Sequence, residues 1–182
     1  MGSGPPPVSR GGFPGHLAVI LAGWDQVANL IYGTMGWPMG AGAMSGTGRK
    51  IEVEQGELLE IKTIYESVMN LAANGLFFRA GQVIGKGIAQ RASAKGGPFV
   101  KALGEVLVTE GWAKSVVLDG ETATIEGCFE ARSGADRSCN LLRGILAEAY
   151  SRHAGTKLFC HEVECVGGGA PKCVFKIRKG VI

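Results

Sequence analysis

The chain has 182 residues, of which 46% are hydrophobic and 19% charged, a composition typical of a globular domain rather than a disordered one. Its net charge is +3 and the basic residues are scattered, which gives no support for nucleic-acid binding. No apolar run is long enough to span a membrane, and the first residues lack the basic start of a signal peptide. We therefore expect a cytoplasmic protein, in which five cysteines favour metal binding over disulfides.

Residues 1–50 are rich in Gly, Pro and apolar residues, and we interpret them as an apolar N-terminal extension. The spacing of their apolar residues predicts one helix over residues 16–32. Because the extension carries few charges, we expect it to pack either on its own chain or on a second subunit. The second possibility predicts a homodimer, with residues 16–40 in the contact.

The next region begins with a short predicted strand over residues 51–54, followed by apolar residues at helical spacing over residues 58–72. We expect Asn74-Gly75 to end that helix.

A second predicted helix covers residues 76–94 and contains Gly81, Gly85 and Gly87. Each glycine lowers the intrinsic stability of a helix by about 1 kcal/mol relative to alanine. Glycines at this spacing allow another backbone or a ligand to come close, and we favour close helix packing over direct ligand contact.

The remaining chain predicts a helix, a β-hairpin, a long helix and a second pair of strands. In chain order, these elements are expected over residues 99–110, 115–118, 121–128, 139–155, 157–163 and 173–178. Asp119-Gly120 between the first two strands is a strong hairpin signal. Helices combined with antiparallel strand pairs predict an α+β fold, with helices packed on an antiparallel sheet.

Four potential metal ligands lie in the C-terminal part of the chain: Cys139, Glu162, Cys165 and Cys173. A glycine-rich loop between Cys165 and Cys173 is suited to a tight reversal that brings its ends together. Three thiolates and a carboxylate are a ligand set for zinc, and four protein ligands are typical of a structural site. Cys139 is expected at the start of a helix, where the helix dipole stabilises a thiolate.

Other residues nearby also offer ligand atoms. Glu164 is an alternative carboxylate to Glu162, while Cys160 and His161 are alternative soft ligands. We interpret Cys128 and Cys160 as small core residues. The alternative to a metal site is that all the cysteines are reduced residues of the core.

The C-terminal motifs resemble the 4-vinyl-reductase-type domain family, which includes the sensor domain of phenol-responsive activators. The resemblance rests on Cys139 at the start of C-N-L-L-R-G, Glu162–Cys165 as E-x-x-C, Gly167–Gly169, and Cys173–Phe175 as C-x-F. It implies zinc at the three cysteines and Glu162. It also implies that residues 51–182 form a ligand-binding domain, whose fold is shared with TRAPP subunits of Golgi transport and with heme nitric-oxide sensors.

In this family the ligand pocket is expected between the helices and the sheet. The resemblance therefore implies an apolar ligand site near Tyr65, Phe78, Ile84, Trp112 and Val116. Phenol-sensing relatives anchor the hydroxyl group with a histidine and a tryptophan, but this chain has no histidine between His16 and His153. We therefore expect an apolar ligand other than phenol, unless Tyr65 or Gln90 supplies the missing donor.

The sequence favours a non-catalytic role, as a sensor or carrier of a hydrophobic small molecule. A metal with four protein ligands has no open position for chemistry, and neither a Ser-His-Asp pattern nor a phosphate-binding loop occurs. Two alternatives stay open: a tetrapyrrole 4-vinyl reductase or its accessory protein, and a scaffold that resembles TRAPP subunits.

Overall fold

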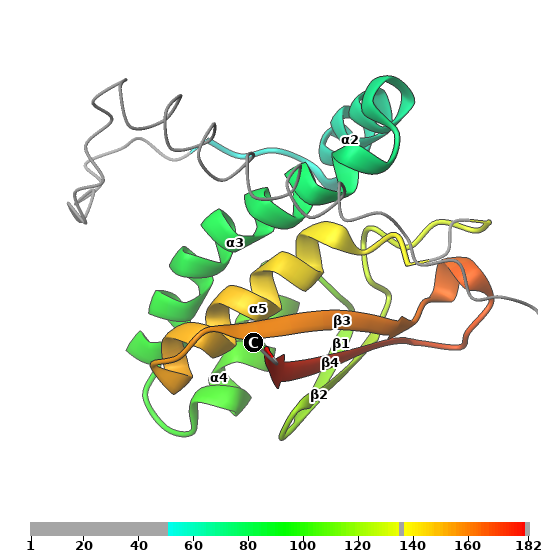
Figure 1. The fold of residues 1–182 in the computed structure, drawn as a ribbon. Helices are drawn as coiled ribbons and strands as arrows, with labels where there is room; N and C mark the ends of the chain where they lie inside the picture. Colours follow the sequence, from blue (N-terminus) through cyan, green and yellow to red (C-terminus); the bar gives the residue numbers. More distant parts are fainter. Residues whose placement is uncertain (1–50, 135–136, 181–182) are drawn as a thin grey trace, which may run out of the picture. The chain divides into compact units, whose positions relative to one another are not determined.

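We analysed a computed structural model, which describes residues 51–134 and 137–180. Its centre is a four-stranded antiparallel sheet with the strand order β1-β2-β4-β3 (Figure 1). The strands are β1 (Ser115–Asp119), β2 (Thr122–Glu126), β3 (Leu158–Glu164) and β4 (Cys173–Lys179). Together with the helices they form the predicted α+β fold.

The helices pack in layers on one side of the sheet. They are α2 (Gln55–Met69), α3 (Leu71–Ala94), α4 (Phe99–Thr109) and α5 (Asn140–Ala154), and a short 3₁₀ turn, η1 (Val166–Gly168), follows β3. In Figure 1, α5 lies against the sheet and runs beside α3, which is on the far side of α5 from the sheet. α4 packs beside β1.

The main core lies between α5 and the sheet. Along β4, Cys173, Phe175 and Ile177 are buried, and the residues between them are only half buried. This alternation is expected for a strand with one face on the core. The α5 residues Leu142 and Ile145 are buried in the same cluster. The sheet and α5 therefore share one core, and the buried cysteines are part of it.

The β1–β2 hairpin confirms the prediction from Asp119-Gly120. Asp119 pairs with Thr122, and Gly120 has a φ of 53°. A positive φ in a two-residue loop is the conformation for which glycine is favoured. The C-terminal helix and strands also lie where the sequence predicts them.

Two predictions for the first part of this region are wrong. Residues 51–54 form no strand, and Ile51 and Val53 are exposed. They lead into α2, where the backbone N–H of Glu54 donates to the Glu57 carboxylate at 2.9 Å in a capping box. This reciprocal cap satisfies backbone groups at the helix start and fixes where α2 begins.

The break between α2 and α3 lies at Asn70 and not at Asn74-Gly75. Asn70 has a φ of 50°, which asparagine tolerates better than most residues. Asn74 and Gly75 instead lie inside α3, where the Asn74 side chain accepts a hydrogen bond from Asn140 at 2.9 Å. Asn74 therefore links α3 to the start of α5 by a hydrogen bond, which its propensity for turns did not indicate.

Gly81 and Gly85 confirm the prediction of close helix packing, whereas the nearest atoms to a Cβ on Gly87 belong to Arg91 of the same helix. An ideal Cβ placed on Gly81 would lie 2.0 Å from the Leu141 carbonyl oxygen, and one on Gly85 would lie 2.8 Å from that of Ile145. On α5, Gly144 has the same role, since its Cβ would lie 2.1 Å from the Phe78 carbonyl oxygen. The backbones of α3 and α5 therefore touch at positions where no side chain fits.

The N-terminal extension over residues 1–50, its predicted helix and its predicted dimer contact all lie outside the described residues. None of the helices within residues 51–134 and 137–180 is long and apolar enough to cross a membrane.

Substitution of Gly81 by alanine tests the close packing of α3 on α5. We expect Gly81→Ala to lower the free energy of unfolding by about 1–3 kcal/mol or more, because its Cβ overlaps rigid backbone. The control is Gly75→Ala in the same helix, where a Cβ meets nothing within 4 Å. Gly75→Ala should raise stability by about 0.5–1 kcal/mol. Urea unfolding of both variants checks this, and equal effects would contradict it.

Candidate metal centre

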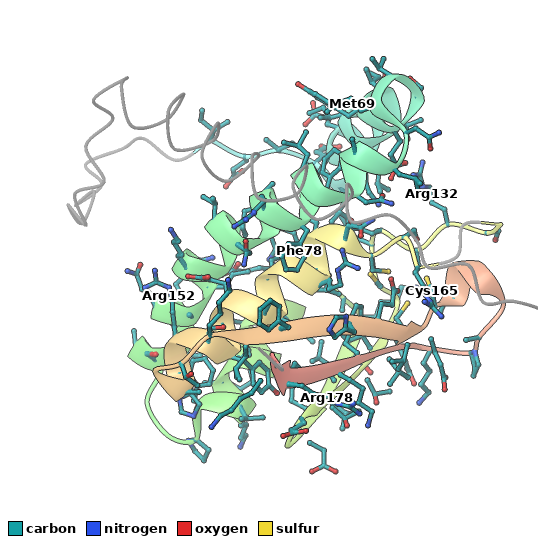
Figure 2. The ribbon with its side chains drawn as sticks, viewed as in Figure 1. Met69, Phe78, Arg132, Arg152, Cys165 and Arg178 are labelled. Carbon is teal, nitrogen blue, oxygen red and sulfur yellow. The ribbon has the colours of Figure 1, made fainter. Side chains whose placement is uncertain are left out.

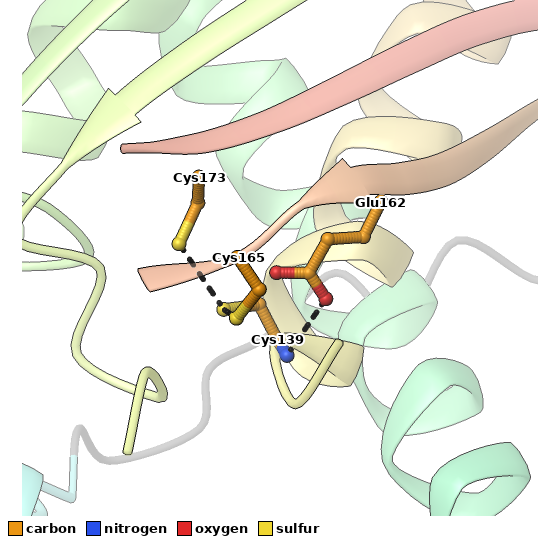
Figure 3. A group of neighbouring side chains, drawn as sticks. All are labelled: Cys139, Glu162, Cys165 and Cys173. Carbon is orange, nitrogen blue, oxygen red and sulfur yellow. Dashed lines mark hydrogen bonds between the residues drawn. The ribbon is translucent and has the colours of Figure 1, made fainter. Parts of the chain in front are cut away.

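Three buried cysteines and one buried glutamate meet at one end of the sheet (Figure 3). Cys139 directly precedes α5, Glu162 belongs to β3, Cys165 follows β3, and Cys173 begins β4. One ligand atom from each residue lies within 4.8 Å of the others. The cluster is therefore a candidate metal centre with four protein donors.

The sulfur spacing fits a tetrahedral ion. The Cys139 sulfur lies 3.8 Å from the Cys173 sulfur and 4.0 Å from the Cys165 sulfur. Two thiolates on one tetrahedral zinc lie about 3.8 Å apart, because each Zn–S bond is about 2.3 Å. The three sulfurs are thus placed to bind one ion without a large rearrangement.

Glu162 has one carboxylate oxygen without a partner. Its Oε2 accepts a hydrogen bond from the Cys139 backbone N–H at 3.1 Å, whereas the buried Oε1 has no hydrogen-bond partner. An unpaired buried carboxylate oxygen is costly unless a cation neutralises it. The free oxygen therefore fits a metal ligand, while the paired one fixes the side chain.

The structure distinguishes Glu162 from the alternative ligands. Along β3, Cys160 and Glu162 point into the core, whereas His161 and Glu164 are exposed. The pairing of β3 with β4 shifts between Glu162 and Glu164, an irregularity of the kind made by a β-bulge. The bulge re-aims the chain, so that Cys165 is buried beside Glu162. Cys160 is buried but is not among the four donors.

Hydrogen bonds and burial set the acidity of the thiols. Interactions with the neighbouring side chains of Cys128 and Cys139, and the hydrogen bond from the Val166 N–H, lower the pKa of Cys173 to about 2. Hydrogen bonds with Cys128 and Cys173, together with burial, raise the pKa of Cys139. Burial raises the pKa of Cys165. The cluster therefore ionises first at Cys173, and a bound cation would favour thiolates at the other two cysteines.

Two basic side chains that are close in sequence to the donors have other partners. Lys172 pairs with Glu126 at 2.6 Å on the surface, and Arg143 lies 5.1 Å from the centre of the Phe78 ring. Backbone N–H groups take their place: that of Val166 donates to the Cys173 sulfur at 3.5 Å. The glycine-rich turn thus supplies backbone donors to the site.

Glu130 is a buried functional group that the sequence did not single out. Its carboxylate accepts hydrogen bonds from the backbone N–H groups of Leu141 at 3.0 Å and Leu142 at 2.8 Å. It therefore satisfies the first turn of α5, the helix that positions Cys139. Burial raises the pKa of Glu130, and the nearby charge of Lys62 opposes this shift.

Lys62 connects this helix start to α2. Its ammonium group is buried, lies 3.2 Å from Glu130 Oε1, and donates to the Ser138 carbonyl oxygen. Lysine is almost always exposed, so a lysine in a helix is ordinarily expected on the solvent face. The sequence therefore did not predict that Lys62 is buried against the start of α5.

The residues of the predicted ligand site are spread over the helices and β1. Phe78, Ile84, Trp112 and Val116 are half buried and pack against the main core, whereas Tyr65 is 45% exposed and lies edge-on to Phe77. Phe78 lies between α3 and α5 (Figure 2). Val116 lines a groove of 780 Å³ beside α4, which the other four residues do not line.

The sequence of the C-terminal part matches a known domain family. The matching model is that of the vinyl-4-reductase (V-4-R) domain, and the match covers residues 122–179. Residues 122–179 are therefore similar to this domain. This segment contains β2, α5, β3 and β4, and with them all four donors of the candidate metal centre. No curated protein matches the chain in sequence.

Solved structures share the fold. The phenol-responsive sensory domain of the transcription activator PoxR is 22% identical, with a TM-score of 0.58, over 72% of this chain and 77% of that chain. A vinyl-4-reductase family protein from Methanocaldococcus jannaschii is 15% identical, with a TM-score of 0.50, over 74% of this chain and 85% of that chain. At these identities the likeness establishes a common fold.

Proposed function

We propose that the chain is a non-catalytic, zinc-stabilised domain that binds a hydrophobic small molecule, as a sensor or carrier. The observation that carries the metal part is the meeting of three buried sulfurs with the unpaired buried oxygen of Glu162. Thiolate ligands favour zinc over magnesium or calcium, which prefer oxygen ligands. The ligand part is supported by the match to the vinyl-4-reductase domain and by the shared fold with a phenol-responsive sensory domain.

A structural role suits this donor set better than a catalytic one. Four protein donors fill a tetrahedral zinc, so no position is left for water or substrate. The four donors are also buried, which keeps solvent away from the ion. In this proposal Cys139, Glu162, Cys165 and Cys173 hold the end of the sheet to the start of α5.

The proposed ligand site comprises Tyr65, Phe78, Ile84, Trp112 and Val116. Four of these side chains are half buried and apolar, as expected for a site that holds an apolar molecule with few polar contacts. In this proposal the partly exposed Tyr65 offers its hydroxyl group to a ligand with a polar end.

One alternative is an enzyme or accessory protein that acts on a tetrapyrrole, a possibility that rests on the name of the matching domain. A scaffold resembling TRAPP subunits is the other. Mass spectrometry of material that co-purifies with the chain separates these possibilities. A porphyrin supports the reductase, a lipid or aromatic compound supports the sensor or carrier, and an empty protein supports the scaffold.

Zinc content tests the metal part of the proposal. Protein purified without chelator is expected to contain close to one zinc ion per chain. Cys173→Ser should lower the zinc content and the melting temperature together, because a structural metal contributes directly to folding. Cys160→Ser is the matched control: it also places a hydroxyl in the core, but leaves the four donors intact. Metal-free wild-type protein with an unchanged melting temperature would exclude a structural metal.

Calorimetric titration tests the choice of ligand. We expect tighter binding of an apolar ring or alkyl compound than of phenol. A buried phenol hydroxyl without a partner costs about 1–3 kcal/mol, which weakens binding by about tenfold to a hundredfold. Within the described residues no imidazole lies between Ile51 and Arg152 to accept or donate that hydrogen bond. A clear preference for phenol over a hydrocarbon of similar size would show this prediction to be wrong.

Light scattering tests the predicted homodimer. Its sequence basis, residues 16–40, lies outside the described residues, but α2 supports it with an apolar surface that no described residue covers. The exposed large apolar side chains on α2 are Ile61, Ile64, Tyr65, Val68 and Met69. We expect the full chain to be a dimer at micromolar concentration, and a chain that starts at Gly48 to dissociate more readily. A monomeric full chain would end the hypothesis.

A further inference from the structure

Cys128 places a fourth thiol against the candidate metal centre. It lies beyond the end of β2, is buried, and its sulfur is 3.1 Å from the Cys139 sulfur. The turn that carries it is well fixed. Gly127 has a φ of 61°, and the Ala131 N–H donates to the Cys128 carbonyl oxygen at 3.2 Å. The backbone that carries Cys128 is therefore held in place beside Cys139.

The geometry argues against Cys128 as a ligand of the same ion. A sulfur separation of 3.1 Å is well below the spacing of about 3.8 Å that two thiolates adopt on a tetrahedral zinc. Cys139 already shows that spacing with Cys173. Moreover, Cys128 is not among the four residues whose donor atoms all lie within 4.8 Å of one another. A hydrogen bond from the Cys128 thiol to the Cys139 sulfur accounts for the short contact.

The net negative charge of the metal site explains why this hydrogen bond would stabilise it. Three thiolates and one carboxylate carry a formal charge of −4, so a divalent ion leaves −2 in a buried site. Such a charge needs hydrogen-bond donors around it. Glu162 has the Cys139 N–H, and Cys173 has the Val166 N–H.

Cys139 lacks a donor of that kind. Among residues 51–134 and 137–180, no backbone N–H or hydroxyl group donates to its sulfur. The Cys139 sulfur contacts three other sulfurs. Two belong to Cys165 and Cys173, which are in the same donor set, and the third belongs to Cys128. The Cys128 thiol is therefore the group placed to offset charge on the Cys139 sulfur.

We propose that Cys128 remains a thiol when the site holds its metal and donates a hydrogen bond to the Cys139 thiolate, which strengthens metal binding. The proposal rests on the proposed function, because it requires a metal at the four donors. Partners that hydrogen-bond to metal ligands typically change metal affinity by about tenfold to a hundredfold when they are removed. Cys128 thus acts through Cys139 and not by touching the ion.

Metal competition with a chromogenic chelator tests the proposal on the full chain. We expect Cys128→Ala to weaken Zn²⁺ binding by about tenfold to a hundredfold. Cys128→Ser should restore most of the affinity, since its hydroxyl can donate the same hydrogen bond. Cys160→Ala is the matched control, because it removes another buried thiol that is outside the donor set, and it should bind like wild type. Unchanged affinity in Cys128→Ala, or equal losses in Cys128→Ala and Cys128→Ser, would overturn the proposal.

Two spectra distinguish a hydrogen-bond donor from a ligand. Co²⁺-loaded Cys128→Ser should keep the wild-type thiolate-to-cobalt absorption, whereas a weaker band would mean that Cys128 is a ligand. Cys160→Ala keeps four cysteines, and Cys128 is the one of them outside the donor set, so the proposal expects it to be the one thiol in the Zn²⁺-loaded variant. Its infrared S–H stretching band should be present and shifted by hydrogen bonding. This measurement needs no change at Cys128, so it stands even if those variants fail to fold. An absent or unshifted band would overturn the proposal, whereas wild-type protein that binds neither ion would instead overturn the proposed function.

Discussion

The first turn of α5 is the point on which the rest of this domain depends. A helix start leaves backbone N–H groups without partners, and here two buried carboxylates take them. Glu162 accepts from the Cys139 N–H, while Glu130 accepts from those of Leu141 and Leu142. One carboxylate comes from β3 and the other from the loop after β2, so the same few N–H groups join two parts of the chain. They also orient Glu162 so that its second oxygen faces the three sulfurs.

The surrounding contacts make this point rigid. Gly81 on α3 and Gly144 on α5 let the two helix backbones touch, so α3 cannot slide along α5 without a clash. Lys62 adds α2 through its buried ion pair with Glu130 and its hydrogen bond to the Ser138 carbonyl oxygen. Removing either partner of a buried pair leaves an uncompensated charge, which costs about 3–5 kcal/mol. The helix packing at Gly81 and the Lys62–Glu130 ion pair therefore both hold the part of the chain that carries Cys139.

Much of the fold and the donor set could be predicted because the signals are local. The Asp119-Gly120 hairpin and the Cys165–Cys173 loop are short-range features whose chemistry restricts the backbone directly. Several features that depend on tertiary contacts escaped prediction. Asn74-Gly75 was predicted to end a helix from its local turn propensity. The contact that keeps Asn74 inside α3 is a hydrogen bond from Asn140, which is far away in the sequence. Cys128 was interpreted as a core residue, since no spacing rule links it to Cys139. Glu162 is distinguished from Glu164 by burial and by the strand irregularity between them, neither of which the spacing alone determines.

The rigid start of α5 also limits how a ligand could act on this domain. Phe78 and Ile84, in the proposed ligand site, lie on α3, whose Gly81 rests on the α5 backbone between them. α5 is held at its first turn by Glu130 and Glu162 and along its length by the sheet core. A molecule beside Phe78 would therefore meet α3 and α5 as one packed unit, because Gly81 and Gly144 bring their backbones into contact. α2 is anchored mainly by polar links, among them Lys62 to Glu130 and Arg132 to Glu66, and it exposes apolar side chains. The Lys62–Glu130 link is buried and costly to break, so α2 is held to the same helix start that positions Cys139.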